Sequence, residues 1–71
     1  MNEVITEVAF KELDYPSEGM IDVYGKIKGK WKGLFVYYKD EITFDEDELI
    51  GLTPEEARQL RLKKDLEYLR S

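Results

Sequence analysis

Apolar and polar residues alternate along the first half of the chain, a pattern typical of strands with one buried face. The alternation is cleanest over residues 20–28, "MIDVYGKIK", where the apolar positions are Ile21, Val23 and Ile27. Residues 3–13 follow the same period, with Val4, Val8 and Phe10 expected on the buried side. We therefore predict two strands here, each with one buried face.

The next segment, residues 31–39, predicts a third strand in which both faces are apolar. One face would carry Leu34, Val36 and Tyr38, and the other Phe35 and Tyr37. Residues 42–44, "ITF", indicate a short fourth strand. Turn formers at 14–19, "DYPSEG", and a tight turn at Gly29-Lys30 would join the strands as hairpins. The result is an antiparallel meander.

The last segment predicts a helix from about residue 54 to about residue 69. Thr53 is placed as the N-cap, Pro54 suits the first helical position, and Glu56 completes a capping box. The apolar residues of this helix form two stripes on nearly opposite sides. These stripes are Ala57, Leu60 and Tyr68, and Leu62, Leu66 and Leu69. Either the helix breaks near 63–65, or it is continuous and its second stripe contacts another subunit.

Together these elements predict a single α+β domain over residues 1–71, with three or four antiparallel strands and one C-terminal helix packed on one face. Its 71 residues include no Cys and no His, so disulfides and the usual zinc sites are absent. A domain of this size is marginally stable, which favours help from self-association. We expect a homodimer whose interface includes Leu62, Leu66 and Leu69.

Charge is divided sharply along the chain, although the net charge is only −5. Residues 26–39 carry five bases and no acid, whereas residues 40–56 carry eight acids and no base. The basic run alternates along a hairpin, where acids of neighbouring strands can pair with it. A net negative chain is also a poor general binder of phosphate, so no direct nucleic-acid partner and no membrane partner is expected.

The acidic stretch "ITFDEDELIGLTPEEA", residues 42–57, invites comparison with a calcium loop. Asp45, Asp47 and Glu56 match positions one, three and twelve, but Leu49 and Ile50 occupy the positions of an oxygen ligand and of the required glycine. No metal site is therefore predicted. The lack of His and Cys, and of any phosphate-binding glycine loop, also argues against an enzyme, and no cofactor is expected.

Protein binding is the remaining interpretation of this stretch. Carboxylates spaced along a surface would attract a basic groove, and apolar residues among them would be desolvated on contact. Leu52 is expected to pack on the helix start as a hydrophobic staple, whereas Leu49 and Ile50 could face either the core or the partner. The predicted partner-binding residues are Phe44, Asp45, Glu46, Asp47, Glu48, Leu49 and Ile50.

One set of residues resembles the pattern of a known family. The set consists of Asp22-Val23, Gly51, Thr53, Glu56 and Leu60-Arg61-Leu62. In these residues the chain resembles the short phage-encoded uracil-DNA glycosylase inhibitors, small acidic homodimers that imitate DNA. The resemblance implies a plug that enters an apolar pocket of the enzyme from just ahead of the helix. Glu46 falls at the plug position here, so Phe44, Leu49 or Ile50 would have to take its place.

We therefore expect a cytoplasmic, non-enzymatic inhibitor that blocks a DNA-handling protein with an acidic, DNA-like surface. The start Met1-Asn2-Glu3 lacks the features of a signal peptide, and no apolar run is long enough to span a bilayer. Two alternatives stay open. One is a small structural protein that only oligomerises, and the other is an oligomer that binds a small molecule in a pocket between subunits, lined by Tyr24, Trp31, Tyr37 and Tyr38.

Overall fold

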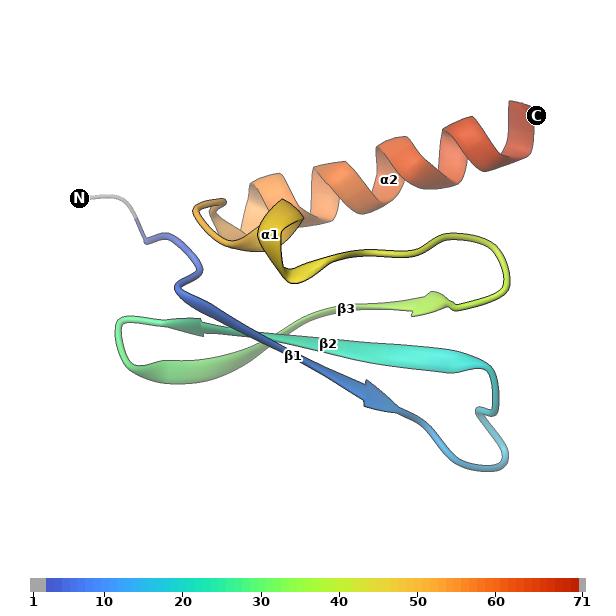
Figure 1. The fold of residues 1–71 in the computed structure, drawn as a ribbon, viewed down its shortest axis with the longest axis horizontal. Coiled ribbons are helices and arrows are strands. Elements are labelled where there is room, and N and C mark those ends of the chain that lie inside the picture. Colours follow the sequence, from blue (N-terminus) through green and yellow to red (C-terminus); the bar gives the residue numbers. More distant parts are fainter. Residues whose placement is uncertain (1–2, 71) are drawn as a thin grey trace.

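The structure is a computed structural model that describes residues 3–70. It has two layers, a three-stranded antiparallel sheet of order β1-β2-β3 and a layer that contains both helices (Figure 1). The elements are β1 (Glu7–Glu12), β2 (Met20–Ile27), β3 (Lys30–Tyr38), α1 (Glu46–Leu49) and α2 (Pro54–Arg70). The predicted α+β meander with a C-terminal helix on one face is confirmed.

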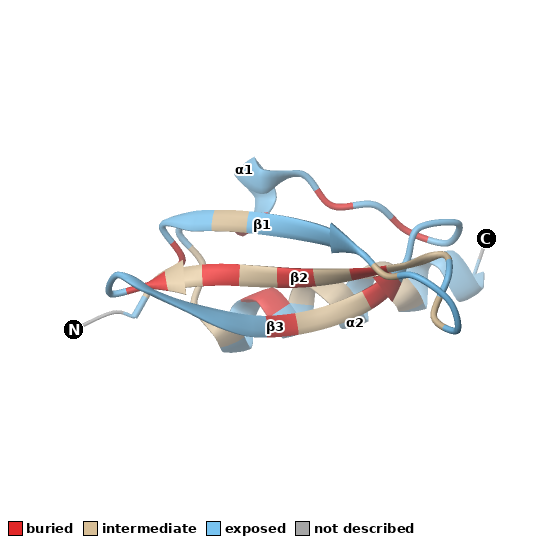
Figure 2. Ribbon diagram, turned by 90° about the horizontal axis from the view of Figure 1, so that it is seen from below, coloured by how far each residue is buried: buried red, intermediate tan, exposed pale blue. Residues whose placement is uncertain are grey.

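Strand β2 is the centre of the sheet and confirms the predicted alternation. Ile21, Val23 and Ile27 are buried, and the residues between them are half-buried or face the open side (Figure 2). Gly25 continues the buried row, and its missing side chain leaves room for neighbours. A Cβ there would lie 2.9 Å from Leu34 Cδ1 and 3.2 Å from Ile5 Cγ1. A side chain at this position would therefore require Leu34 and Ile5 to shift.

Strand β3 differs from its prediction because a β-bulge shifts its register. Val23 pairs with Phe35 and Tyr24 with Gly33, so Leu34 has no partner on β2. An extra residue in one strand turns the following side chains by one position. As a result Leu34 and Tyr37 are both buried on the core side, and the predicted grouping of Leu34 with Val36 and Tyr38 is wrong.

The N-terminal segment also buries a different residue from the one expected. Ile5 is fully buried, whereas Phe10 is 38% exposed near the end of edge strand β1. Ile5 lies ahead of β1, where its N–H donates to Leu52 O at 2.8 Å and its carbonyl accepts from Gly51 N at 2.8 Å. The chain therefore leaves the sheet at this point and turns toward the second layer. Val4 and Val8 are only half-buried.

The β2–β3 turn lies one residue earlier than predicted. Ile27 pairs with Lys30, so the two loop residues are Lys28 and Gly29, with φ values of 53° and 78°. Positive φ at both central residues is the requirement of the type I′ turn, whose twist matches that of a hairpin. The turn at Gly29-Lys30 is therefore replaced by one at Lys28-Gly29.

Helix α2 begins as the sequence predicts. Thr53 N–H donates to Glu56 Oε1 at 2.9 Å, and Glu56 N–H donates to Thr53 Oγ1 at 3.2 Å, which completes the capping box. The helix then continues without a break to Arg70. Asp65 caps no second helix, because its carboxylate pairs with Arg61 one turn earlier at 3.2 Å. The alternative of a break near 63–65 is therefore wrong.

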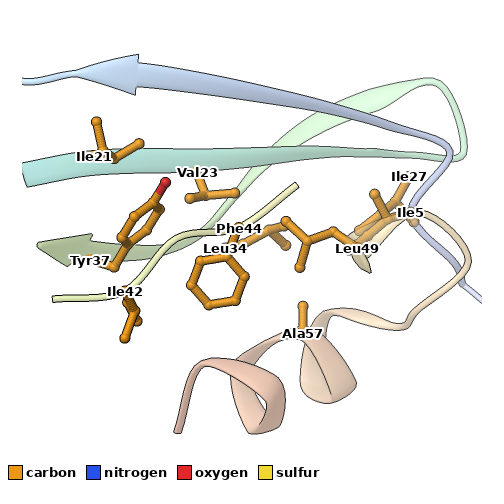
Figure 3. Close-up of a cluster of buried hydrophobic side chains, with 10 residues drawn as sticks. All are labelled: Ile5, Ile21, Val23, Ile27, Leu34, Tyr37, Ile42, Phe44, Leu49 and Ala57. Carbon is orange, nitrogen blue, oxygen red and sulfur yellow. The ribbon is translucent and has the colours of Figure 1, made fainter. Parts of the chain in front are cut away.

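The predicted fourth strand at residues 42–44 does not form. The free edge of β3 is already occupied, because Arg61 Nε donates to Val36 O at 2.9 Å and Arg58 Nε donates to Leu34 O at 3.3 Å. The segment instead runs beside α2 in the second layer, where Ile42 and Phe44 are buried against the sheet (Figure 3). Phe44 contacts the rings of Phe35 and Tyr37, with centroid distances of 4.9 and 5.0 Å.

We predict that Leu49→Ala destabilises the domain much more than Ile50→Ala does. Leu49 is fully buried, and removal of a buried leucine side chain costs about 2–5 kcal/mol including the cavity term. Ile50 is 43% exposed, and its truncation is expected to cost about 1 kcal/mol or less. Urea denaturation of both variants measures the difference, and equal losses of stability would contradict the burial pattern.

Candidate functional site

The acidic segment forms a one-turn helix, α1, that the sequence analysis did not foresee. Asp45 is the N-cap, and its N–H donates to Glu48 Oε1 at 2.8 Å. The turn ends where Ile50 N–H donates to Glu46 O at 3.0 Å and Gly51 takes a φ of 93°, which glycine adopts without strain. The pattern Asp45-x-x-Glu48 is itself a capping-box signature, so the signal was present in the sequence.

A cluster of contacts around Lys64 fixes α1 and its approach segment against α2. Lys64 Nζ lies 2.8 Å from Glu48 Oε2 and 4.2 Å from the centroid of the Phe44 ring, and it also donates to the carbonyl of Thr43. A cation over an aromatic face is attracted by the ring quadrupole. We call this set, Lys64 with Thr43, Phe44 and Glu48, the Lys64 cluster.

The Lys64 cluster also sets the ionisation of Glu48. The hydrogen bond from Lys64, followed by the one from the Asp45 N–H, lowers the pKa of the Glu48 carboxyl below its ordinary value of 4.5. Both donors favour the charged form of the carboxyl. Glu48 is thus held in its charged form by its contact with Lys64.

The predicted partner-binding residues separate into two groups. Phe44 is 6% exposed and Leu49 is fully buried (Figure 3), so neither side chain reaches the surface, and their predicted contact with a partner does not fit their position. The physical reason is the need to fill the core beneath α1. Glu48 belongs to the Lys64 cluster. The exposed members outside this cluster are Asp45, Glu46, Asp47 and Ile50.

We refer to these four exposed residues as the acidic surface. Within residues 3–70, neither Glu46 nor Asp47 forms an ion pair, so both charges face solvent uncompensated. Leu49 fixes α1 to the core because its side chain is buried, and Glu48 fixes α1 to α2 through its ion pair with Lys64. The acidic surface is therefore presented on a fixed support, with Ile50 as its apolar member.

A second exposed feature lies on α2. Leu62, Leu66 and Leu69 are 56%, 48% and 75% exposed, in contrast with the fully buried Ala57 on the sheet side. The predicted dimer residues are thus accessible. Beside them runs a shallow groove of about 310 Å³, which the sequence analysis missed. It is lined by Gln59, Leu62, Lys63, Leu66, Glu67 and Arg70.

Three of the five lysines of the basic run pair with acids of neighbouring segments, as predicted. Lys26 pairs with Glu7 and Lys28 pairs with Glu3, each at 3.2 Å. Lys39 pairs with Glu12 at 3.1 Å. These pairs are exposed, so their contribution to stability is small, but they reduce the positive potential that a phosphate backbone would require.

The four aromatic residues of the proposed small-molecule pocket do not meet. Tyr37 is buried in the core, where burial raises the pKa of its hydroxyl. Tyr24 lies on the opposite face of the sheet and donates to Asp22 Oδ2 at 2.7 Å, a hydrogen bond that raises the pKa of Tyr24. Trp31 is on the same open face, beside Lys26. One protomer therefore provides no single aromatic pocket.

Across residues 3–70, no group of three or more acidic, His or Cys side chains is arranged to hold a metal ion. Over the same part of the chain, no helix combines the length and the apolar character required to cross a bilayer.

The chain was compared with known protein families, with curated proteins and with solved structures, and none of the three comparisons found a match. The resemblance to the uracil-DNA glycosylase inhibitors therefore stays a prediction. Function has to be argued from the acidic surface and from the exposed face of α2.

The Lys64 cluster gives a pH-dependent prediction. Because the pKa of Glu48 is lower in the folded state, its ionised form stabilises the fold above about pH 4.5, and this contribution is lost as pH falls through the folded pKa. We expect the stability advantage of the wild type over Glu48→Gln to shrink from pH 7 to about pH 3.

Thermal or urea denaturation over this pH range tests the expectation. Glu46→Gln is the matched control, because Glu46 has no ion pair within the described residues and its loss should leave the pH profile nearly unchanged. A Glu48→Gln variant with the same pH profile as the wild type would show that the Lys64 cluster does not stabilise the fold through this charge.

Proposed function

We propose that this chain is a non-enzymatic binding protein that docks into a basic groove of a partner protein through its acidic surface. The observation that supports the proposal is the separation of roles within one short segment. Leu49 and Glu48 hold α1 in place, while Glu46, Asp47 and Ile50 are exposed beside one another. A surface that needs no ordering before contact loses less entropy when it binds.

Electrostatic attraction is the main driving force of the proposed encounter. The chain carries a net charge of −5, and the paired lysines of the hairpin offset little of the field around α1. Electrostatic potentials of opposite sign on two proteins raise their association rate, and salt screens this attraction. The partner is therefore expected to present clustered Arg and Lys, as DNA-handling proteins do.

Ile50 is the residue proposed to enter an apolar site of the partner. Of the three plug candidates, Phe44 and Leu49 are committed to the core, and Ile50 is 43% exposed. Desolvation of one aliphatic side chain supports residence time more than specificity. The proposed inhibitor thus combines three carboxylates with a single aliphatic contact.

Reversal of two charges tests this mechanism. Glu46→Lys/Asp47→Lys should slow association with the partner and remove most of its salt dependence, because steering depends on these exposed carboxylates. Asp14→Lys/Glu18→Lys is the matched control, since it changes the net charge equally at exposed positions of the β1–β2 turn. Surface plasmon resonance at several salt concentrations provides the rates.

The first partner to assay is uracil-DNA glycosylase, which the sequence resemblance suggests. Inhibition of uracil excision that duplex DNA competes away, and that the charge reversal weakens, is the expected result. If the glycosylase does not bind, proteins captured from a lysate should be displaced by duplex DNA. Binding with unchanged rates in the charge-reversed variant would refute the acidic surface as the contact.

An assembly protein is the second candidate, favoured by the exposed leucines of α2. The small-molecule oligomer is less favoured, because Tyr37 faces the core and Tyr24 faces the opposite side of the sheet.

A further inference from the structure

The outer face of α2 carries three exposed leucines that the described chain leaves uncovered. At about 100° per residue, Leu62, Leu66 and Leu69 lie on the side of the helix opposite the buried Ala57, and all three are exposed. A helix needs only one apolar stripe to pack on a sheet, and Ala57 and Leu60 already provide it. The second stripe is therefore unexplained by the fold of one protomer.

We infer that a second copy of this chain docks on this stripe, with the two α2 helices antiparallel and Leu66 of each copy next to the twofold axis. A twofold interface uses the same surface on both copies, so it must be complementary to itself. The inference does not depend on the acidic surface, which lies on α1 and stays exposed in such a dimer.

The spacing of the leucines meets this requirement. Leu62 lies four residues before Leu66, and Leu69 lies three residues after it, so all three share one side of the helix. Reversal of the helix direction about a point between Asp65 and Leu66 then places Leu62 of one copy level with Leu69 of the other. The ridge formed by Leu62 and Leu66 meets the groove beside Lys63 and Glu67, as in ridge-into-groove packing.

The charges beside the stripe are complementary in the same arrangement. Lys63 and Glu67 both line the groove, and neither forms an ion pair within residues 3–70. Antiparallel docking about a point between Asp65 and Leu66 places Lys63 of each copy close to the level of Glu67 of the other. Asp65, by contrast, is already engaged by Arg61 at 3.2 Å, so it does not compete for Lys63.

The size of the stripe indicates a weak dimer. At about 1.5 Å per residue, the leucines span only about 10 Å of helix. Stable specific dimers bury at least about 1,200 Å² in total, which three partly exposed leucines and their flanks do not reach by themselves. We therefore expect association in the micromolar to millimolar range, visible as a mass that rises with concentration.

Sedimentation equilibrium over a wide concentration range tests the inference. The wild type should approach the mass of a dimer, and Leu66→Glu should raise the dissociation constant at least about tenfold. Leu66 is 48% exposed, so this variant should keep its helix and its unfolding midpoint, as circular dichroism can verify. Ile50→Glu is the matched control, because Ile50 is similarly exposed but lies off α2.

A charge exchange tests the register. Lys63→Glu alone and Glu67→Lys alone should each weaken the dimer, because each places like charges opposite one another. The double variant Lys63→Glu/Glu67→Lys should restore the wild-type dissociation constant.

Three outcomes would overturn the inference. These are a strict monomer at millimolar concentration, a dimer unaffected by Leu66→Glu, and a dimer that the charge exchange fails to restore. The second outcome would assign the interface to another surface, such as the open edge of β1.

Discussion

The structure depends on one constraint: a single helix cannot cover a three-stranded sheet. Helix α2 lies over β3, and the area above β1 and β2 has to be filled by something else. The connection between β3 and α2 fills it, with Ile42, Phe44 and Leu49 pointing into the core (Figure 3). The Lys64 cluster holds this connection against the helix, so the second layer acts as one unit.

The same constraint accounts for the form of the acidic surface. The connection between β3 and α2 directs some of its side chains into the core. Its remaining side chains must therefore face outward. In this chain those residues are carboxylates, and the one-turn helix α1 gathers them on one side of Leu49. Acidic residues in the first turn also suit the positive end of a helix. The binding hypothesis thus rests on residues that the core leaves over, and Ile50 is the aliphatic residue among them.

Sequence patterns predicted the elements whose signals are local. Strict alternation identified β2, and the residues Thr53, Pro54 and Glu56 identified the start of α2. Features that depend on distant segments were not predictable in the same way. The bulge that buries Leu34 follows from pairing with β2, and the absence of a fourth strand follows from two helix arginines on the edge of β3.

The candidate site also contains features that local sequence patterns could not predict. Hydrophobic periodicity did not decide whether Leu49 or Ile50 faces the core. The one-turn helix α1 determines which of these two adjacent residues faces inward, and one turn contains too few residues to show a period. The capping-box signature at Asp45 and Glu48 would have predicted the turn, but not its orientation on the core.

The hydrogen bonds from Arg58 and Arg61 to β3 also determine how the sheet could grow. They occupy carbonyls that an added strand would need, whereas the outer edge of β1 has no strand partner. A sheet with one closed edge can accept a strand on one side only. Association through strands alone would therefore pair two copies edge to edge and leave no second edge for a further strand. Two arginine side chains thus limit growth through the sheet itself.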